Sequence, residues 1–532
     1  MKVLICDPVS PKGIALLQQR PEFQVVVLDK RLSEAELIPL VADVAAMVVR
    51  SETKITRKLM EAAPKLRVVG RAGVGIDNVD VEAATQQGVV VMNTPGGNTI
   101  STAELSFAML TALARKVPQA HVSMLAGKWD RKQFTGMELA GKTLGILGMG
   151  RIGTEVAKRA IAFGMRVLAY DPYLTEARAK AIGAELVLEL DEIYRQADFI
   201  TVHMPVTAET KQMINAAAFS KMKPGVRLVN CARGEIIDET DLLAALESGK
   251  VAGAALDVFS VEPLPADHPF RKAPNLILTP HLGASTSEAQ EKCGIEVAEI
   301  IAAYLLTGEV RNAVNLPYLD AKTYEQVKPY LPLGEQMGKL LSQLTSANAD
   351  RIYITFGGKA RELPNIDPIT RAVLRGFLAN NALADVNNVN VRSAAAGLGL
   401  TVEEKKSDQP VTFNEWLHVQ IFSGDTKLVS AGGTFFGSPN NPRIVRLFST
   451  PVEIPISGTL LLLNNKDRPG IVGHLGTLLA RHGVNIASMS LNRDEAGGQA
   501  LTVLNLDSVP PPSALAELES DPAISNVRVV QF

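Results

Sequence analysis

Short apolar runs alternate with segments of helical pattern over the first half of the chain, and this alternation restricts the fold more than any other feature. Apolar runs at residues 3–6, 23–28 and 45–49 are separated by helical patterns at 13–20 and 33–44, and the alternation continues to about residue 259. Strands that alternate with helices form βαβ units around a parallel sheet. We therefore predict an α/β fold with two Rossmann-like, doubly wound lobes.

The second half of the chain follows different patterns. A cluster of prolines near residues 315–333 ends the alternation, and residues 316–457 mix strand and helix patterns, so we predict an α+β domain there. Its expected elements are strands at 351–356, 416–422 and 442–448 and a helix at 368–383. Residues 458–532 follow the order βαββαβ, which is typical of the ferredoxin-like fold. A chain of 532 residues is long enough for three or four such domains.

Composition excludes several classes of protein. Lys and Arg number 54 against 56 Asp and Glu, a balance that does not favour binding to nucleic acid. Cys6, Cys231 and Cys293 form no C-x-x-C pair, so we expect neither a disulfide framework nor a metal site, and a reducing, cytoplasmic location fits best. The sequence contains no run of eighteen apolar residues, so we do not expect a membrane span. The N-terminal residues have the pattern of a β-strand rather than of a signal peptide.

A glycine pattern stands at one of the predicted strand-to-helix turns. The apolar run 144–147 is followed by Gly148, Gly150 and Gly153, with Arg151 and Ile152 between the last two, and then by a helical pattern at 154–163. In that context Gly148 permits a tight turn, Gly150 lets the backbone approach a pyrophosphate, and Gly153 lets helix and strand pack closely. The pattern by itself also occurs in turns that bind nothing, but here it predicts a dinucleotide site at the start of the helix.

The next predicted strand, residues 166–170, ends in Asp171. A carboxylate at this position accepts hydrogen bonds from the adenosine ribose and repels a 2′-phosphate. Pro172 and Tyr173 follow it, and neither can pair with such a phosphate. We therefore expect NAD rather than NADP.

Polar residues follow the later strands of the same lobe. Strands at 198–202, 226–230, 253–256 and 275–279 lead into His203 and Pro205, into Cys231, Ala232 and Arg233, into Asp257, and into His281. In a parallel sheet, ligands lie across the carboxyl ends of the strands, so these residues should meet at one crevice.

Three of the nearby side chains suit hydride transfer on a 2-hydroxy acid. The forked guanidinium of Arg233 can hold a carboxylate and polarise a carbonyl. His281 can exchange a proton near neutral pH, and Glu262 can orient its imidazole. Taken singly, each of them could also be an ordinary structural residue.

Longer runs carry a resemblance to a known family. The runs VNCARGEIIDE (229–239), AALDVFSVEP (254–263) and TPHLGAST (279–286) resemble the D-2-hydroxyacid dehydrogenases. Together with GRAGVGIDNVD (70–80) and the run 129–153, they resemble the long-form phosphoglycerate dehydrogenases of that family. The resemblance implies NAD-dependent oxidation of 3-phosphoglycerate to 3-phosphohydroxypyruvate, the first step of serine biosynthesis. It places the catalytic Arg–Glu–His triad on Arg233, Glu262 and His281, and Asp257 against the nicotinamide. The cofactor residues expected besides the glycine loop and Asp171 are His203, Pro205, Cys231, Ala232, Arg233, Asp257, His281, Gly283 and Ala284.

The resemblance also implies a division into domains. An NAD-binding domain at residues 98–282 would be inserted into a substrate-binding domain made of residues 1–97 and 283–315. The substrate's carboxylate and phosphate would meet Arg50, Ser51, Arg71 and the backbone of Gly73, Val74 and Gly75, with Arg131 and Lys132 reaching the site from a neighbouring subunit. The chain would then be a homodimer or homotetramer.

The last two domains resemble the regulatory half of the same enzymes. Residues 458–532 resemble an ACT domain, a small-ligand sensor, in which Asp467 and Asn485 match residues that hold an effector such as L-serine and Asn465 stands at a third effector position. Asn465 departs from the pattern, because some serine-inhibited relatives carry His or Tyr there. Residues 316–457 resemble the intervening domain, where four cations suggest an anion site: Lys359, Arg361, Arg443 and Arg446.

Two alternatives remain open. Corepressors of the same fold bind NAD without catalysis and keep the triad, although they lack an appended ACT domain. Other members of the family act on glyoxylate, hydroxypyruvate or D-lactate, and they are shorter than this chain.

Overall fold

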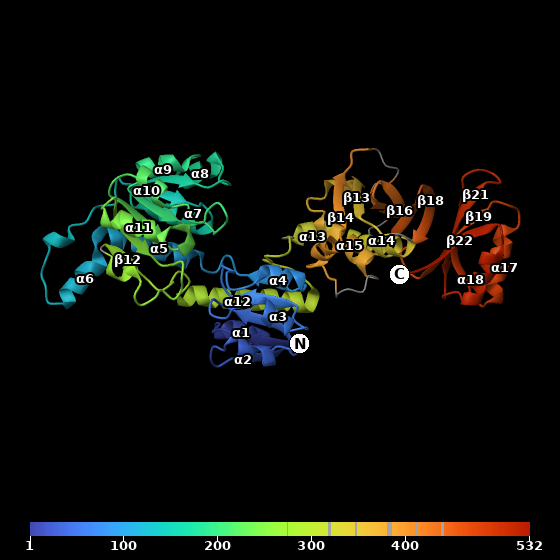
Figure 1. Ribbon diagram of the computed structural model, residues 1–532, viewed down its shortest axis with the longest axis horizontal. Coiled ribbons are helices and arrows are strands. Elements are labelled where there is room, and N and C mark those ends of the chain that lie inside the picture. The colour runs from blue at the N-terminus through green and yellow to red at the C-terminus, as the bar shows by residue number, and fades with distance from the viewer. Residues whose placement is uncertain are drawn as a thin grey trace.

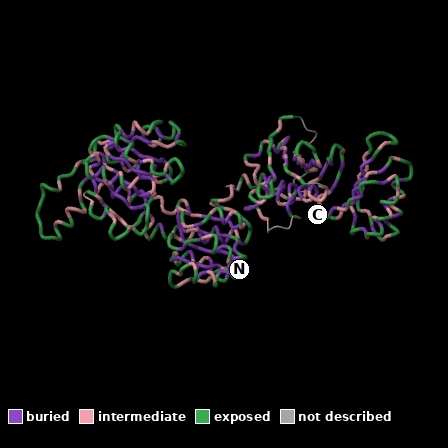
Figure 2. Tube along the Cα trace, in the orientation of Figure 1, coloured by how far each residue is buried: buried purple, intermediate pink, exposed green. Residues whose placement is uncertain are grey.

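A computed structural model describes residues 1–273, 275–317, 321–345, 348–379, 386–409, 413, 415–437 and 441–532, and it divides their strands among four sheets. Figure 1 shows the four sheets as four bodies along the long axis, with the C-terminal body at the end opposite the seven-stranded one. Each body has its own buried interior (Figure 2). No helix among the described residues is long and apolar enough to cross a membrane.

The first body is a parallel five-stranded sheet in the order β2-β1-β3-β4-β5. Its strands are β1 (Lys2–Ile5), β2 (Gln24–Val27), β3 (Val44–Val49), β4 (Val68–Arg71) and β5 (Val90–Asn93), and its helices are α1 (Pro11–Gln18), α2 (Glu34–Leu37), α3 (Arg57–Glu61) and α4 (Val81–Gln86). The helix predicted at 33–44 is shorter than expected. It becomes α2 and the 3₁₀ turn η1 (Ile38–Leu40), because Pro39 has no N–H with which to continue the helix.

The second body is a parallel seven-stranded sheet in the order β12-β11-β10-β9-β6-β7-β8. Its strands are β6 (Thr143–Leu147), β7 (Arg166–Tyr170), β8 (Glu185–Leu186), β9 (Phe199–Val202), β10 (Val226–Asn230), β11 (Val251–Leu256) and β12 (Leu276–Leu278). Its helices include α5 (Thr99–Arg115), α7 (Arg151–Ala162), α8 (Glu176–Ile182), α9 (Leu190–Gln196), α10 (Ala216–Lys221) and α11 (Glu239–Glu247). The strand order reverses between β6 and β9, which is where doubly wound sheets bind ligands. The predicted α/β lobes are confirmed.

Two long helices show how the chain passes between these bodies. α5 packs on α7 and on β10 and β11 of the seven-stranded sheet, whereas α12 (Ser287–Thr307) returns to pack on α1, β4 and β5. The domain division at 97/98, 282/283, 315/316 and 457/458 stays a prediction. The helix α6 (Val117–Leu125), which follows α5 in the chain, has no buried residue and projects from the end of the molecule (Figure 1).

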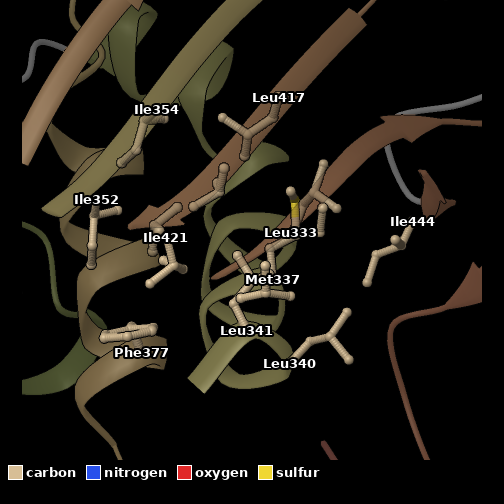
Figure 3. Close-up of a cluster of buried hydrophobic side chains, with 14 of the residues drawn as sticks. Leu333, Met337, Leu340, Leu341, Ile352, Ile354, Phe377, Leu417, Ile421 and Ile444 are labelled. Atoms are coloured by element: carbon tan, nitrogen blue, oxygen red, sulfur yellow. The ribbon is translucent and has the colours of Figure 1, made fainter. Parts of the chain in front are cut away.

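The third body is richer in structure than the sequence predicted. Its sheet has the order β14-β13-β15-β16-β17-β18, with strands β13 (Arg351–Gly358), β14 (Thr401–Lys406), β15 (Glu415–Ser423), β16 (Thr426–Phe435), β17 (Pro442–Leu447) and β18 (Thr450–Pro455). Its helices are α13 (Ala321–Val327), α14 (Tyr330–Leu344), α15 (Asp367–Leu378) and α16 (Val391–Gly397). Pro332 lies in the first turn of α14, where a proline is tolerated, so the proline cluster contains helix starts. α14 and α15 cover one face of the sheet and bury Leu333, Met337, Ile352 and Ile421 (Figure 3).

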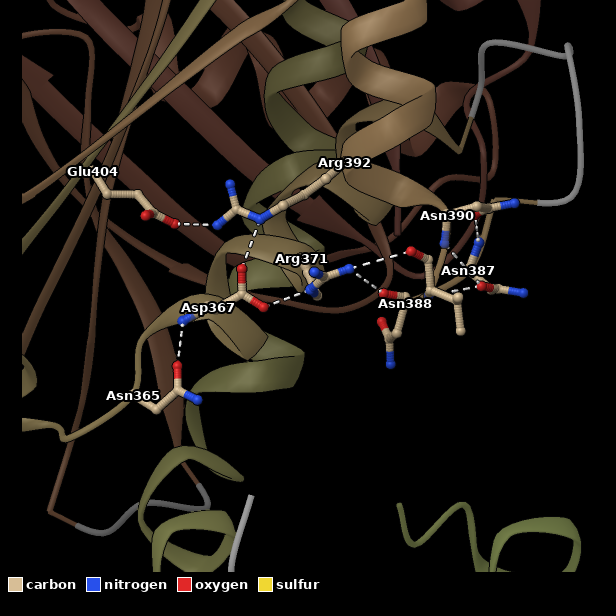
Figure 4. Close-up of polar contacts among 9 residues, drawn as sticks. Asn365, Asp367, Arg371, Asn387, Asn388, Asn390, Arg392 and Glu404 are labelled. Atoms are coloured by element: carbon tan, nitrogen blue, oxygen red, sulfur yellow. Dashed lines mark hydrogen bonds and ion pairs between the residues drawn. The ribbon is translucent and has the colours of Figure 1, made fainter. Parts of the chain in front are cut away.

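A polar network holds the third body against the first. Asp367 accepts hydrogen bonds from Arg371 and Arg392, and Arg371 also donates to the carbonyl of Asn388 (Figure 4). The neighbouring Asn387 donates to the carbonyl of Gly88 in the five-stranded body. Val389 is buried in the hydrophobic core of that same body.

The fourth body has the predicted ferredoxin-like order, with strands β19 (Thr459–Lys466), β20 (Ile486–Arg493), β21 (Gln499–Leu506) and β22 (Ile524–Gln531) and helices α17 (Ile471–Arg481) and α18 (Pro512–Ser520). The helices pack on one face of its sheet, where strand residues such as Leu461 and Leu504 are buried. The other face, which includes Leu460, Leu462 and Val503, joins the hydrophobic core of the third body. Figure 1 shows its strands between its own helices and that body.

Candidate active site

The glycine turn has the geometry that a dinucleotide site needs. Gly148 has a φ of +98°, and a Cβ built on Gly153 would lie 2.0 Å from the carbonyl oxygen of Gly148, so both positions require glycine. A Cβ on Gly150 would meet nothing within 4 Å. The space in front of Gly150, at the start of α7, is therefore open, while the turn behind it is closed. Arg151 is exposed and Ile152 half-buried at that same helix start.

Asp171 lies at the end of β7 and is bonded to the same turn. Its carboxylate accepts hydrogen bonds from the N–H groups of Met149, at 2.8 Å, and Tyr173, at 2.8 Å. These bonds orient the carboxylate beside the glycine turn.

The other predicted strand-end residues also lie at the carboxyl edge of the seven-stranded sheet. His203 Nε2 is 3.0 Å from Thr201 Oγ1, and burial lowers the pKa of His203 to about 4. Pro205 is exposed. Cys231 is buried against Met109, and burial raises the pKa of its thiol to about 12, so it is an inert apolar side chain rather than a nucleophile.

Arg233 is positioned by a residue that sequence reasoning missed. The buried side chain of Asn230 accepts from the N–H of Ala232 at 3.0 Å and donates to the carbonyl of Arg233 at 2.8 Å. These two bonds close the turn after β10 and set the direction in which Arg233 leaves it.

The guanidinium of Arg233 reaches the five-stranded body. Its Nε and Nη2 each lie 3.0 Å from Asp77 Oδ2. A Cβ built on Gly75 would lie 1.9 Å from Arg233 Nη2, and one on Gly73 would lie 1.6 Å from Arg71 Nη1. The glycine loop therefore lies directly against two guanidinium groups, and a side chain at either position would displace them. The carbonyl of Val74, between these glycines, is held by Asn93 Nδ2 at 2.6 Å.

Arg71 and Arg50 add positive charge at the same place. Burial and the neighbouring charge of Arg233 lower the pKa of Arg71 to about 10, with a smaller contribution from Arg50. Buried Arg71 Nε has no hydrogen-bond partner among the described residues. The loop that carries Arg50 and exposed Ser51 is fixed by Asp7, which accepts from the N–H of Arg50 at 2.6 Å. The three guanidinium groups of Arg50, Arg71 and Arg233 therefore form an electropositive site, and the single carboxylate of Asp77 does not balance their charge.

His281 and Glu262 form a pair across two loops. His281 Nδ1 lies 2.7 Å from Glu262 Oε2, and Glu262 Oε1 accepts from the N–H of Phe259 at 3.0 Å. Burial alone raises the pKa of Glu262, but the bond and charge of His281 outweigh it and leave the pKa lowered; Arg233 adds a smaller pull in the same direction. His281 has a φ of +54°, an uncommon conformation for a residue other than glycine, and such strain clusters at functional sites.

Asp257 braces the His281 loop from inside. It is fully buried, and it accepts hydrogen bonds from Thr279 Oγ1 and from the N–H groups of Leu282 and Gly283. Burial raises its pKa. The carbonyl of Gly283 in turn accepts from Ser101 at the start of α5. Ala284 lines a small pocket with Arg50 and Cys293.

Arg131 and Lys132 are not brought to this site within one chain. They lie on or beside the exposed turn η2 (Lys132–Phe134), beyond α6 at the projecting end of the molecule.

Each of the three expected effector residues is bonded to a different partner within the fourth body. Asn465 is buried and accepts from Thr502 Oγ1 at 2.7 Å. Asp467 accepts from Arg493 at 2.7 Å, and Asn485 donates to Asp507 at 2.7 Å.

Sequence reasoning also missed Asp77, although it lies in the quoted run GRAGVGIDNVD. No spacing rule would pair it with Arg233, which is 156 residues away.

Comparisons with known proteins identify the family of this chain. Residues 107–283 match the family "D-isomer specific 2-hydroxyacid dehydrogenase, NAD binding domain", residues 326–448 match the "D-3-phosphoglycerate dehydrogenase intervening domain", and residues 459–523 match the "ACT domain". A D-3-phosphoglycerate dehydrogenase of Synechocystis sp. is 42% identical and covers 100% of this chain and 95% of its own; that of Archaeoglobus fulgidus is 42% identical, with 100% of both chains covered. That of Bacillus subtilis is 40% identical and covers 100% of this chain and 99% of its own.

Solved structures resemble the first part of the chain. The TT0316 protein of Thermus thermophilus is 36% identical with a TM-score of 0.55, covering 59% of this chain and 100% of its own. An NAD-dependent formate dehydrogenase of Staphylococcus aureus, solved with NAD, is 30% identical with a TM-score of 0.53, covering 59% of this chain and 98% of its own. The chain therefore belongs to the D-3-phosphoglycerate dehydrogenase family and is an NAD-dependent dehydrogenase with an intervening domain and an ACT domain.

Proposed function

We propose that this chain oxidises D-3-phosphoglycerate to 3-phosphohydroxypyruvate with NAD, the first step of serine biosynthesis. The observation that carries the proposal is one arrangement: the His281–Glu262 pair and Arg233 follow strands of the seven-stranded sheet, and Arg233 is close enough to Arg71 of the five-stranded body, with Arg50 beside it, to lower the pKa of Arg71. A proton acceptor beside a site for two anionic groups suits a hydroxy acid that carries both a carboxylate and a phosphate.

The open space in front of Gly150 and the carboxylate of Asp171 fit a dinucleotide. The start of α7 would hold the pyrophosphate and Asp171 the adenosine ribose. The chemistry that NAD supplies when bound is acceptance of a hydride.

The protein's own residues then hold the substrate and move its proton. Arg233 pairs with the substrate carboxylate through its forked guanidinium, which requires Asp77 to give up its two contacts. Because ionised Glu262 accepts a hydrogen from His281 Nδ1, His281 Nε2 is left to accept the proton of the substrate hydroxyl. Ionised Glu262 stabilises the imidazolium that forms.

The phosphate is assigned to Arg50 and Arg71. Arg71 Nε is buried with no hydrogen-bond partner among the described residues, and a dianionic phosphate would satisfy it and offset the repulsion among the three arginines. Arg131 and Lys132 would contribute only from a second subunit, which requires an oligomer.

The test is NADH formation with D-3-phosphoglycerate, run beside D-glycerate and D-lactate. Arg71→Gln should raise KM for phosphoglycerate and leave the weaker reaction with D-glycerate unchanged, because D-glycerate has no phosphate. Equal kcat/KM for the two substrates in the unmodified protein would refute the proposed substrate.

We further propose that the ACT domain senses L-serine through Asp467 and Asn485, and that the protein works in the cytoplasm. Asp467 can accept from an ammonium group, although it must share its carboxylate with Arg493 and Gly497. Asn465 is bonded inside the domain, so we assign it a role in holding β19 to β21 rather than direct contact. Calorimetry with L-serine on the full chain and on Asp467→Ala tests this, and equal heats from the two would reject it.

A further inference from the structure

The glycine loop that follows β4 has two backbone N–H groups that no described residue accepts from. Gly73 donates its N–H to the carbonyl of Arg71 at 2.9 Å, whereas Val74 and Gly75 donate to none of the described residues. Both of these residues are half-buried. A Cβ built on Gly75 would lie 1.9 Å from Arg233 Nη2, so this part of the loop lies directly against the guanidinium of Arg233. The loop therefore keeps two donors beside a cation.

The end of β5 determines which way these donors point. The carbonyl of Gly73 accepts from the N–H of Thr94 at 3.0 Å, and the carbonyl of Val74 accepts from Asn93 Nδ2 at 2.6 Å. In a trans peptide unit, the carbonyl and the N–H of the next residue point in opposite directions. Because both carbonyls point toward β5, the N–H groups of Val74 and Gly75 point away from it.

Only the second of these peptide units is held by a side chain. The peptide between Val74 and Gly75 precedes a glycine, which has no Cβ to restrict its rotation. If that peptide turned over, the carbonyl oxygen of Val74 would replace the N–H of Gly75, and an acceptor repels an anion that a donor would bind. The amide of Asn93 opposes this rotation.

Asn93 is itself held in place. It ends β5, where it pairs with Arg71 of β4, and its N–H donates to the carbonyl of Asn312 at 3.2 Å. Asn312 has a φ of +52°, a conformation that asparagine adopts more readily than most residues, and its Nδ2 donates to Glu296 Oε1 of α12 at 2.9 Å. The strand end is thus fixed from both sides, and the Asn93 side chain donates from a fixed position.

We propose that Asn93 is a positioning residue for the dehydrogenase reaction. Its side-chain amide fixes the peptide between Val74 and Gly75, so that the two N–H groups meet the substrate carboxylate beside Arg233. Asn93 acts through the loop and does not touch the substrate. The proposal rests on the proposed role of Arg233 in binding a carboxylate. It does not depend on which hydroxy acid is used, because every 2-hydroxy acid carries that carboxylate.

Steady-state kinetics on the full chain tests this role. Asn93→Ala should raise the KM for the hydroxy acid by about ten- to a hundredfold, because charge-assisted hydrogen bonds to the carboxylate are lost. The kcat should fall by less than about threefold, because the carboxylate is bound alike in the ground and transition states. The Kd for NAD should not change. If the unmodified protein oxidises D-glycerate or D-lactate but not D-3-phosphoglycerate, the proposed substrate is wrong, and Asn93→Ala is tested with the acid that is oxidised.

Asn315 provides a matched control at the other end of β5. Its Nδ2 donates to the carbonyl of Val89 at 2.8 Å, just before the strand begins. Asn315→Ala therefore removes the same kind of bond from the same body, and it should lower the Tm without changing the KM. Asn93→Ser is the second variant if Asn93→Ala does not fold; its shorter side chain cannot reach the Val74 carbonyl, so it should also raise the KM. An unchanged KM in a folded Asn93 variant, a loss confined to kcat, or an equal rise of KM in Asn315→Ala would overturn the proposal.

Discussion

At the scale of single residues, His281, the proposed proton acceptor, is paired with Glu262, a carboxylate whose pKa is lowered by that contact. His281→Ala should lower kcat by about 10²–10⁴-fold, the usual contribution of a general acid or base. NAD binding should change little, because the proposed contacts of the glycine turn and Asp171 are with the other end of the cofactor. Steady-state kinetics and NADH titration measure the two effects, and a variant that keeps most of its kcat would rule out this role.

The proposed role of Arg233 in binding the substrate carboxylate implies that Asp77 competes with the substrate for its guanidinium. Asp77→Asn should lower KM for the substrate by up to about fivefold, because the Asp77 side chain is 71% exposed and such pairs are weak. The Kd for NAD should not change. A higher KM would mean instead that Asp77 is needed to position Arg233.

Buried His203 should make the stability of the seven-stranded body fall at acidic pH. Its pKa is lowered from 6.5 to about 4, so between these values the unfolded chain binds a proton that the folded chain does not. The stability contributed by neutral His203 is complete above pH 6.5 and declines as the pH falls toward about 4. Calorimetry from about pH 7 to about pH 5 should show a smaller loss of Tm in His203→Gln than in the unmodified protein. The exposed His121→Gln serves as control and should behave like the unmodified protein.

At the scale of elements, the turn from β6 to α7 contains one glycine that close packing requires, Gly153, and one that faces open space, Gly150. Gly153→Ala should lower the Tm of the cofactor-free protein, because its Cβ would meet the carbonyl of Gly148. Gly150→Ala should leave that Tm unchanged and weaken NAD binding, because its Cβ would enter the open space at the helix start. Thermal melts with and without NAD distinguish the two. The same Tm loss in both variants would show that the space at Gly150 serves packing alone.

At the scale of the whole molecule, the ACT sheet shares a hydrophobic core with the intervening domain. Leu462→Ala should cost about 2–5 kcal/mol of stability, because Leu462 is buried where the two bodies meet. Val472→Ala, on the exposed side of α17, should cost less than about 0.5 kcal/mol. Denaturant unfolding of the full chain gives both values. A small loss in Leu462→Ala would indicate that the two domains are only loosely joined.

This shared core also bears on regulation. The sheet face that could pair with a second ACT domain is already covered, so a dimer of these domains must use sheet edges or helices. Two contacts then connect the ACT domain to the five-stranded body: the core that it shares with the intervening domain, and the bond from Asn387 of the intervening domain to Gly88. An effector can bias the candidate active site only by favouring one arrangement of these contacts.

Much of the fold and part of the candidate site follow from local sequence patterns. The strand–helix order, the glycine turn and Asp171 are set by residues close together in the chain, and strand ends in a parallel sheet share one edge, which grouped Arg233, Asp257 and His281 correctly. The pairing of Arg233 with Asp77, the bracing of its turn by Asn230 and the covered face of the ACT sheet arise only when distant segments meet. Asn465 matched an effector position in the sequence, yet the register of β19 with β21 places it against Thr502 in the interior. Alternation along a strand predicts two faces, but which face packs and which borders a cavity is decided by the partner that tertiary structure brings to it.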